Sequence, residues 1–92
     1  MSVKMNIPFF LRRHTDSVAV LEVNGNTIGE CFKQLMKHYP QTKKWFAFRD
    51  GKLLSDAAFF MLLNGESIYP IKLDRPTKDG DEIFMGLLIG GG

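Results

Sequence analysis

The chain has 92 residues, which is enough for one domain with a single hydrophobic core and too few for two. Hydrophobic residues make up 45% of it and charged residues 24%, a composition typical of a globular protein rather than a disordered one. The net charge of only +2 does not predict the broad basic surface of a nucleic-acid-binding protein, although it leaves room for local basic clusters.

The compartment is indicated by three features of the sequence. Cys31 is the only cysteine, which excludes an intrachain disulfide and a multi-cysteine metal site. Lys4, Asn6 and Pro8 interrupt the apolar stretch that a signal peptide would need. Nowhere do about 18 apolar residues follow one another, as a membrane span requires. We therefore expect a cytoplasmic protein with no membrane partner, no nucleic-acid partner and no bound metal or cofactor.

Two strands are predicted at the N-terminus. Apolar residues occupy every second position of residues 3–11, which places them on one face of a first strand: Val3, Met5, Ile7, Phe9 and Leu11. A polar break follows at residues 12–16. Residues 17–23 predict a second strand that pairs with the first as a β-hairpin, with Ala19, Leu21 and Val23 on its inner face.

One amphipathic helix is predicted next. Thr27 followed by Glu30 forms a capping-box pattern, which satisfies free N–H groups at the start of a helix. Apolar residues then recur at helical spacing and define the face that points at the sheet: Ile28, Cys31, Phe32, Leu35 and Tyr39. Pro40 ends the helix, because proline disfavours helical backbone in the residue before it.

The second half of the chain is predicted to hold three strands. Residues 41–57 show no clean period and contain the turn Asp50–Gly51, which indicates an irregular connection with one short helical turn. The apolar run at residues 58–63 predicts a strand that ends at the turn Asn64–Gly65. Residues 67–71 predict a short edge strand interrupted by Pro70. After a polar turn at residues 77–81, residues 82–88 predict a last strand with Ile83, Met85 and Leu87 on one face.

This order of elements predicts an α+β domain. One helix covers only one face of a sheet, so we expect a mixed sheet with the main helix packed on one side, the β-grasp or ubiquitin-like arrangement. The first strand has the most complete alternation and is the candidate for the central position. Residues 1–88 form the single domain, and residues 89–92 form a flexible C-terminal glycine tail.

No conventional catalytic motif is present in the sequence. A phosphate-binding loop, a zincin helix, zinc-finger spacing and a nucleophile elbow are all missing. His14 and His38 stand far apart without a partner at catalytic spacing, and Cys31 lies on the predicted apolar face of the helix, where a buried thiol is unreactive. We therefore expect a protein that acts through partner enzymes rather than an enzyme.

The C-terminus carries the strongest functional signal. Gly90, Gly91 and Gly92 follow the last strand, and glycine constrains the backbone less than any other residue. Without Cβ atoms, the four residues from Ile89 can pass through a narrow channel and reach roughly 13 Å into another protein. A carboxylate delivered in this way can be activated as an acyl-adenylate.

Several segments together resemble a known family. They include Ile7–Pro8, Leu11–Arg12, His14–Thr15, residues 25–28, Tyr39–Pro40, residues 63–65, residues 73–76 and residues 78–83. Nine residues then follow Ile83, the interval that this family uses to reach its closing Gly-Gly. Over nearly its whole length the chain is similar to the ubiquitin-like sulfur carriers of the MoaD/ThiS type, above all to the small subunit of molybdopterin synthase and to the sulfur carrier of cysteine synthesis.

The resemblance implies a function for the tail. An ATP-dependent, ubiquitin-activating-like adenylyltransferase would adenylate Gly92, which a sulfur donor would convert to a thiocarboxylate. A sulfur-acceptor enzyme, such as a molybdopterin synthase large subunit or a cysteine synthase, would then use the sulfur. Gly90 and Gly91 would supply reach, while Leu87, Leu88 and Ile89 would line the entrance to the partner.

Two positions depart from the family pattern. Leu87–Leu88 stands where the family has one or two prolines, and Gly86 where it often has an apolar docking side chain. The run of five apolar residues from Phe59 also exceeds the needs of one sheet face. Phe60 and Leu62 share one of its faces, which either docks a partner or is covered by the segment around Trp45 and Phe48.

Two other functions stay open from the sequence alone. The same adenylated glycine could be joined to lysine amines, which would make the protein a ubiquitin-like modifier. Alternatively, the protein could be an interaction module with an inert tail. The receiving pathway, whether molybdopterin, cysteine or thiamine synthesis, is not determined by the sequence.

Overall fold

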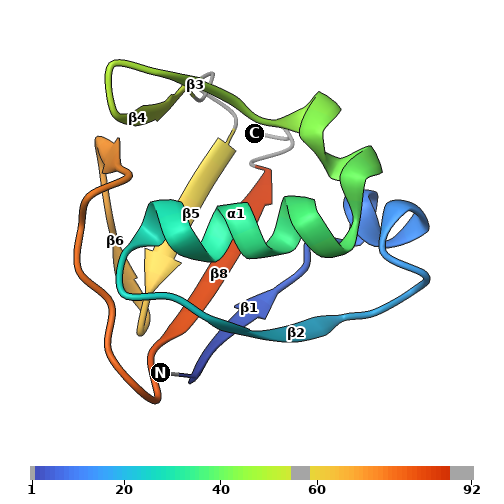
Figure 1. Cartoon of the computed structure of the whole chain (residues 1–92), viewed down its shortest axis with the longest axis horizontal. Helices are drawn as coiled ribbons and strands as arrows, with labels where there is room; N and C mark the ends of the chain where they lie inside the picture. Colours follow the sequence, from blue (N-terminus) through green and yellow to red (C-terminus); the bar gives the residue numbers. More distant parts are fainter. Residues whose placement is uncertain (1, 55–58, 88–92) are drawn as a thin grey trace.

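Two small sheets and one long helix make up the fold (Figure 1). The computed structural model describes residues 2–54 and 59–87. The larger sheet has five strands in the order β2-β1-β8-β5-β6. Its strands are β1 (Ser2–Asn6), β2 (Val20–Asn24), β5 (Phe59–Leu63), β6 (Glu66–Ser67) and β8 (Glu82–Leu87). Helix α1 (Ile28–His38) crosses one face of this sheet, which confirms the predicted β-grasp arrangement.

The strand β8 holds the two halves of the larger sheet together. It pairs parallel with β1, with Met5 opposite Ile83, and antiparallel with β5, with Met61 opposite Met85. β1 also pairs antiparallel with β2, as the predicted hairpin requires. The last strand therefore occupies the central position that the sequence assigned to the first. Alternation of apolar residues shows that one face of a strand is buried, but it does not show where in the sheet the strand lies. β1, like β8, is paired on both sides.

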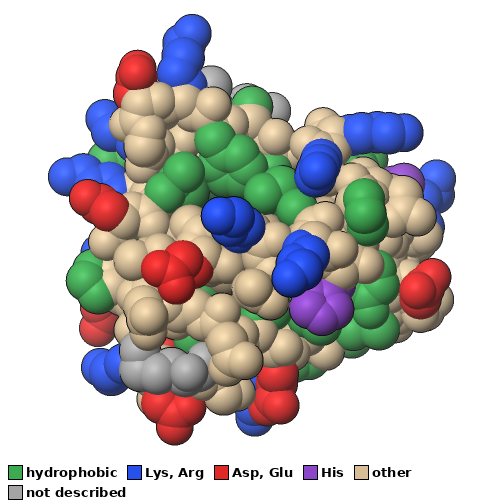
Figure 2. All heavy atoms as spheres, viewed as in Figure 1, with side chains coloured by type: hydrophobic (Ala, Val, Ile, Leu, Met, Phe, Trp, Pro, Cys, Tyr) green, Lys and Arg blue, Asp and Glu red, His purple; other side chains and the backbone are tan. Residues whose placement is uncertain are grey.

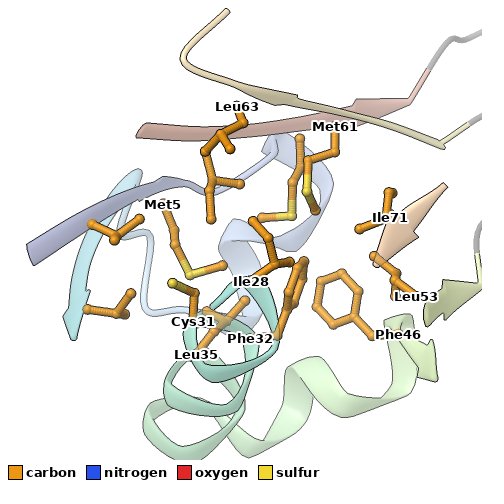
Figure 3. Packing of buried hydrophobic residues seen from close by; sticks show 14 of the residues in the cluster. Met5, Ile28, Cys31, Phe32, Leu35, Phe46, Leu53, Met61, Leu63 and Ile71 are labelled. Carbon is orange, nitrogen blue, oxygen red and sulfur yellow. The ribbon is translucent and has the colours of Figure 1, made fainter. Parts of the chain in front are cut away.

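The hydrophobic core lies between α1 and the larger sheet (Figure 3). Met5, Ile83 and Met85 come from β1 and β8, two of the three internal strands, and each is no more than 1% exposed. They meet the predicted apolar face of α1, of which Ile28, Cys31, Phe32 and Leu35 are fully buried, while Tyr39 is half-buried directly after the helix.

Both ends of α1 follow the sequence signals. The hydroxyl oxygen of Thr27 accepts a hydrogen bond from the N–H of Glu30 at 3.1 Å, and the Glu30 carboxylate accepts one from the N–H of Asn26 at 3.1 Å. This reciprocal pair satisfies two N–H groups at the N-terminal end. The helix ends at His38, directly before Tyr39 and Pro40.

The predicted first strand is too long by five residues. β1 ends at Asn6, and η1 (Phe9–His14) is a 3₁₀ helix. Pro8 has no N–H to continue a ladder, and its carbonyl instead accepts a hydrogen bond from the N–H of Leu11 at 2.9 Å. Leu11 stays buried, but Phe9 is 85% exposed, so its predicted place on the inner face of the strand is wrong.

The second strand starts three residues later than predicted. Asp16 and Ser17 both have positive φ angles, 51° and 65°, which a strand does not allow. β2 therefore begins at Val20, and of the predicted inner residues Val23 is buried, Leu21 is half-buried and Ala19 is exposed.

A second sheet replaces much of the predicted irregular connection. After the 3₁₀ helix η2 (Pro40–Trp45), β3 (Ala47–Arg49) and β4 (Lys52–Leu54) form a hairpin, and β7 (Ile71–Lys72) adds a third strand. The hairpin turns at Asp50 and Gly51, with φ angles of 54° and 72°. Both positive φ angles are typical of a tight two-residue turn, so the Asp-Gly pair was a hairpin signal that the sequence reading missed.

The predicted strand at residues 67–71 is divided between the two sheets. β6 ends at Ser67 on the edge of the larger sheet, and β7 begins at Ile71 in the smaller one. Pro70 separates them, so the predicted interruption is confirmed while the single strand is not.

Phe46, directly before the smaller sheet, and Phe48 of β3 close one end of the core. The ring of Phe32 lies 5.0 Å from that of Phe46 and 5.9 Å from that of Phe48, both in edge-to-face geometry. Phe46 also meets Phe59 of β5 at 6.5 Å. Aromatic pairs at these distances contribute beyond their buried area, so Phe32 links α1 to both sheets.

Phe32 is expected to be a large single contributor to stability. Replacing it with alanine should lower the free energy of unfolding by about 3–5 kcal/mol, because it removes a fully buried ring. Urea denaturation followed by circular dichroism measures the change. Phe9→Ala is the matched control, and it should stay within about 0.5 kcal/mol of wild type because Phe9 is almost fully exposed. Equal effects of the two substitutions would contradict the described core.

Hydrogen bonds connect the polar turn before β8 to Asn64 in the turn after β5 and to the start of β8. Asp81 is 4% exposed, and its carboxylate accepts hydrogen bonds from the Asn64 side chain at 2.9 Å and from the Lys78 N–H at 2.8 Å. Asn64, with a φ of 52°, in turn accepts from the N–H of Glu82 at 2.8 Å. The bond from Asn64 is the main cause that holds the pKa of Asp81 below its usual value, with smaller contributions from Lys78.

The lowered pKa of Asp81 predicts a dependence of stability on pH. Its ionised form stabilises the folded state fully above the unfolded pKa of ~3.9, and this contribution disappears as pH falls through the lower folded pKa. Asp81→Asn should reduce the free energy of unfolding at neutral pH by about 1–3 kcal/mol. The amide replaces one carboxylate oxygen with an NH₂ group, which cannot accept the hydrogen bond that Asn64 or Lys78 donates there. The difference from wild type should shrink below the folded pKa. Urea denaturation at several pH values measures it, and a difference that grows with acidity would contradict the assignment.

Candidate docking site at the end of the last strand

The side of the larger sheet that faces away from α1 carries an apolar strip. Alternation along β5 sends Met61 and Leu63 into the core, and therefore Phe60 and Leu62 to the outer face, where both are half-buried. On the neighbouring strand β8, Phe84 points the same way and is 47% exposed. The register places Leu62 opposite Phe84, and the rings of Phe60 and Phe84 lie 6.4 Å apart.

A shallow depression extends from this strip to the 3₁₀ helix η1. Its lining comes from the end of β1, from η1 and from the last residues of β8, and Asn6, Pro8, Phe9, Phe10, Arg12, Phe60, Phe84, Gly86 and Leu87 are among its members. Arg12 is fixed at its rim, because its Nε–H donates to the carbonyl of Ile7 at 3.1 Å. The depression therefore lies where β8 leads into the C-terminal residues.

Gly86 allows the ring of Phe60 to lie against the sheet. A Cβ atom at position 86 would come within 2.6 Å and 2.7 Å of two ring carbons of Phe60, closer than real contacts allow. The two residues are directly opposite each other across the strands. Gly86 therefore does not leave a gap: the neighbouring strand supplies an aromatic side chain that covers the position.

A polar strip runs beside the apolar one. The Asn6 side chain donates to the Glu82 carboxylate at 2.8 Å and to the carbonyl of Ile83 at 3.1 Å. Lys4 is in register with Glu82 on one side and with Glu22 on the other, and all three are exposed. The outer face thus offers an incoming protein an apolar region with a charged margin, as protein interfaces do.

The predicted site residues divide into two groups. Phe60, Leu62 and Leu87 lie at or near the depression; Leu87 is 37% exposed at the end of the core-facing side of β8. Leu88, Ile89, Gly90, Gly91 and Gly92 lie outside the described residues. The sequence left two possibilities for the face that carries Phe60: it docks a partner, or the segment around Trp45 and Phe48 covers it. In the described residues this segment does not cover it. Phe48 packs on Phe32 on the helix side, and Trp45 packs on Phe10 and His14.

Sequence reasoning missed Phe84 and Phe9 as parts of this surface. Phe84 alternates with the buried residues Ile83 and Met85, so the same period of two that located the core could have placed it outside. Phe9 was assigned to a strand face, and only the turn at Pro8 releases it to the surface.

Within the described residues, the remaining candidate groups provide neither an exposed thiol nor a metal site. Cys31 is fully buried, and the loss of solvent is the largest cause that raises the pKa of its thiol, partly offset by a hydrogen bond with Thr77. In residues 2–54 and 59–87, no group of three or more His, Cys, Asp or Glu side chains could hold a metal ion. No helix in this part of the chain is long and apolar enough to cross a membrane.

The contact between Gly86 and Phe60 can be tested by a double-mutant cycle. Gly86→Ala alone should destabilise the protein by about 1 kcal/mol, because the new methyl group displaces the Phe60 ring. In a Phe60→Ala background the same change should be neutral or stabilising, since alanine costs less conformational entropy than glycine. Urea denaturation of the four proteins gives the coupling energy. Additive effects would show that the ring does not occupy this position.

Solved structures with the same fold cover nearly the whole chain. CysO in the crystal structure of the Amycolatopsis orientalis BexX/CysO complex is 25% identical, with a TM-score of 0.81 over 98% of this chain and 99% of that one. Small archaeal modifier protein 1 (SAMP1) from Methanosarcina acetivorans is 27% identical, with a TM-score of 0.75 over 99% and 96% of the two chains. A molybdopterin converting factor subunit 1 from Pyrococcus furiosus is 22% identical, with a TM-score of 0.70 over 97% and 99%.

These similarities rest on structure rather than on close sequence relationship. No protein-family model matches the chain, and no curated protein matches it. The likeness to the Pyrococcus furiosus protein shows the fold alone at that identity. The chain has the β-grasp fold of the CysO, SAMP1 and MoaD-like structures, and its resemblance to the ubiquitin-like sulfur carriers is confirmed.

Proposed function

We propose that the protein is a cytoplasmic sulfur carrier whose C-terminal Gly92 is adenylated by a ubiquitin-activating-like enzyme and then converted to a thiocarboxylate. The observation that carries the proposal is the position of β8. This strand is paired on both sides in the middle of the sheet, and its last residues border the apolar depression. A partner that docks on the depression therefore has the end of β8 beside it.

The reach of the remaining residues fits this role. Five residues follow Leu87, and a fully extended chain of that length spans about 17 Å. Three of them are glycines, which allow the backbone to pass a narrow channel without steric hindrance from side chains. The anchored strand fixes where the tail starts, and the partner supplies the catalytic groups that this chain lacks.

The chemistry of the tail consists of one nucleotidyl transfer and one acyl substitution. The Gly92 carboxylate attacks the α-phosphate of ATP and displaces pyrophosphate, which gives the acyl-adenylate. Sulfide released by a sulfur donor then attacks the carbonyl carbon, forms a C–S bond and displaces AMP, which leaves the thiocarboxylate. ATP is thus a substrate of the activating enzyme, and this chain supplies the acyl group that carries the sulfur.

Two kinds of acceptor enzyme fit the proposal. A molybdopterin synthase large subunit would make this chain the small subunit of that enzyme, whereas a cysteine synthase would make it a carrier of the CysO kind. The similarity to CysO, the partner of BexX in its complex, supports docking on an enzyme that receives the tail. Thiamine synthesis is a third destination. Genes that neighbour the coding sequence would separate the pathways.

A second function is favoured by the similarity to a small archaeal modifier protein. The same adenylate would then be attacked by a lysine amine, and Gly92 would end in an isopeptide bond. Sulfide and amine are alternative nucleophiles for one activated carbonyl. Digestion of cellular proteins followed by mass spectrometry would detect Gly92 on lysine side chains if the protein acts as a modifier.

The proposal predicts a C-terminal mass change that depends on the docking site. With ATP, a sulfur donor and the cognate activating enzyme, the intact mass should rise by the difference between sulfur and oxygen. Phe84→Ser should lower kcat/KM for this conversion by about tenfold or more, because it removes an apolar side chain at the centre of the interface. Val20→Ser is the matched control, since Val20 is also 47% exposed on the same sheet but lies on the edge strand β2.

The outcomes separate the two parts of the proposal. If the wild-type mass never changes under these conditions, the sulfur-carrier chemistry is wrong. If the thiocarboxylate forms equally fast with Phe84→Ser, the chemistry holds and the assigned docking site is wrong. Deletion of Gly91 and Gly92 should abolish the mass change without lowering the free energy of unfolding.

A further inference from the structure

We infer that the two 3₁₀ helices form a second contact surface, which binds an acidic segment on the protein that docks beside β8. This basic turn surface consists of Arg12 and Arg13 from η1, Lys43, Lys44 and Trp45 from η2, and the ring of Phe10 between them. It contains neither Phe60 nor Phe84, and it shares Phe10 and Arg12 with the depression. The inference rests on the docking part of the proposed function and not on the sulfur chemistry.

Aromatic packing holds the two helices side by side. The ring of Trp45 lies 5.3 Å from that of Phe10 and 6.0 Å from that of His14, in tilted geometry at 59° and 46°. Trp45 is still 49% exposed although it has these partners. A half-exposed tryptophan is a typical anchor of protein interfaces, which are enriched in tryptophan and arginine.

The charge on this surface is of one sign. The segments Phe9–His14 and Pro40–Trp45 contain four Lys or Arg residues and no Asp or Glu, although the chain has ten acidic residues. Figure 2 shows several Lys and Arg side chains at the upper right, where η2 lies in Figure 1, as well as others at the upper left and in the centre. Among the described residues, Arg13, Lys43 and Lys44 form no ion pair that would neutralise them. The net charge of +2 for the whole chain therefore does not reveal this local group of positive charges.

The surface is continuous with the docking depression. Phe10 and Arg12 belong to both, and Phe9 projects between them with 85% of its surface exposed. A protein seated on the depression to receive the tail therefore extends over η1. Complementarity of charge then requires a carboxylate-rich segment on that protein at the margin of the docking site, where it also raises the rate of association.

A protein segment fits these features better than a nucleic acid or a lipid surface. Single-stranded nucleic acids stack on free aromatic faces along a basic groove, whereas the rings here pack tilted against one another. A membrane-surface element is an amphipathic helix with a long apolar face, and η1 and η2 have six residues each.

Peptide binding tests the inference with a reporter that the chain already contains. The probe is a synthetic Glu- and Asp-rich peptide of about twelve residues, compared with the same peptide in which Gln and Asn replace the acids. Trp45 is the only tryptophan, so its fluorescence reports binding at η2 directly. Amide NMR shifts locate the contact. The titration is run on the full chain and on a chain without residues 90–92, because removal of the tail should leave peptide binding intact.

Charge-reversal variants give the specificity control. K43E/K44E should weaken binding of the acidic peptide about tenfold or more at low salt, and Arg13→Glu should weaken it in the same direction. K52E/K72E carries the same change in net charge on the exposed pair of β4 and β7, away from η1 and η2 in Figure 1, and should stay within about twofold of wild type. Unchanged urea denaturation confirms that each variant is folded.

Three results would overturn the inference. The first is no preference for the acidic over the neutral peptide. The second is equal weakening by K43E/K44E and K52E/K72E, which would reflect net charge alone. The third is tighter binding of oligouridylate or of phosphatidylglycerol vesicles than of the acidic peptide, which would assign the surface to nucleic acid or to membrane. None of these results depends on whether Gly92 accepts sulfur.

Discussion

The parallel pairing of β1 with β8 is the constraint on which the rest of the structure depends. β1 and β2 belong to one half of the chain, and β5, β6 and β8 to the other; only the pairing of Met5 with Ile83 and its neighbours joins them into one sheet. A parallel pair needs a crossover connection, and α1 lies within it. The crossover therefore delivers the helix to the face that buries Met5, Ile83 and Met85. Because β8 is internal, the residues that follow it start beside the middle of the sheet.

The two faces of this sheet serve different purposes. Fully buried residues such as Ile28 and Phe32 fill the face under α1, and Phe46, between η2 and the smaller sheet, closes its end. The other face carries partly exposed aromatic residues that no element of the described chain covers. Gly86 has no side chain, and the ring of Phe60 from β5 occupies the space above it. The sheet thereby keeps an apolar surface at the position that would otherwise be the least covered.

The surface chemistry suits a protein whose reactions take place on other proteins. The described residues provide an apolar depression, a charged margin and a one-signed basic surface around the end of β8, but no cluster of catalytic or metal-binding side chains. The surfaces proposed to bind partners thus lie on the strands and 3₁₀ helices of the folded domain. In the proposed function the reacting carboxylate belongs to Gly92, which lies outside the described residues. This division explains how a domain with so few reactive groups could serve several partner enzymes in turn.

The sequence by itself determined the local elements with strong patterns. The capped helix, the alternation in β1 and β8 and the turn at Asn64 all followed from the period of apolar residues and from side chains that bond to nearby backbone. The tail chemistry was also inferred from sequence and stays a proposal, because residues 88–92 lie outside the described part. Tertiary structure alone decided which strand is central, how residues 46–54 join β7, that Phe60 covers Gly86, and that η1 packs on η2. These features depend on contacts between residues far apart in the chain, and a periodic pattern reports which face is buried but not what covers it.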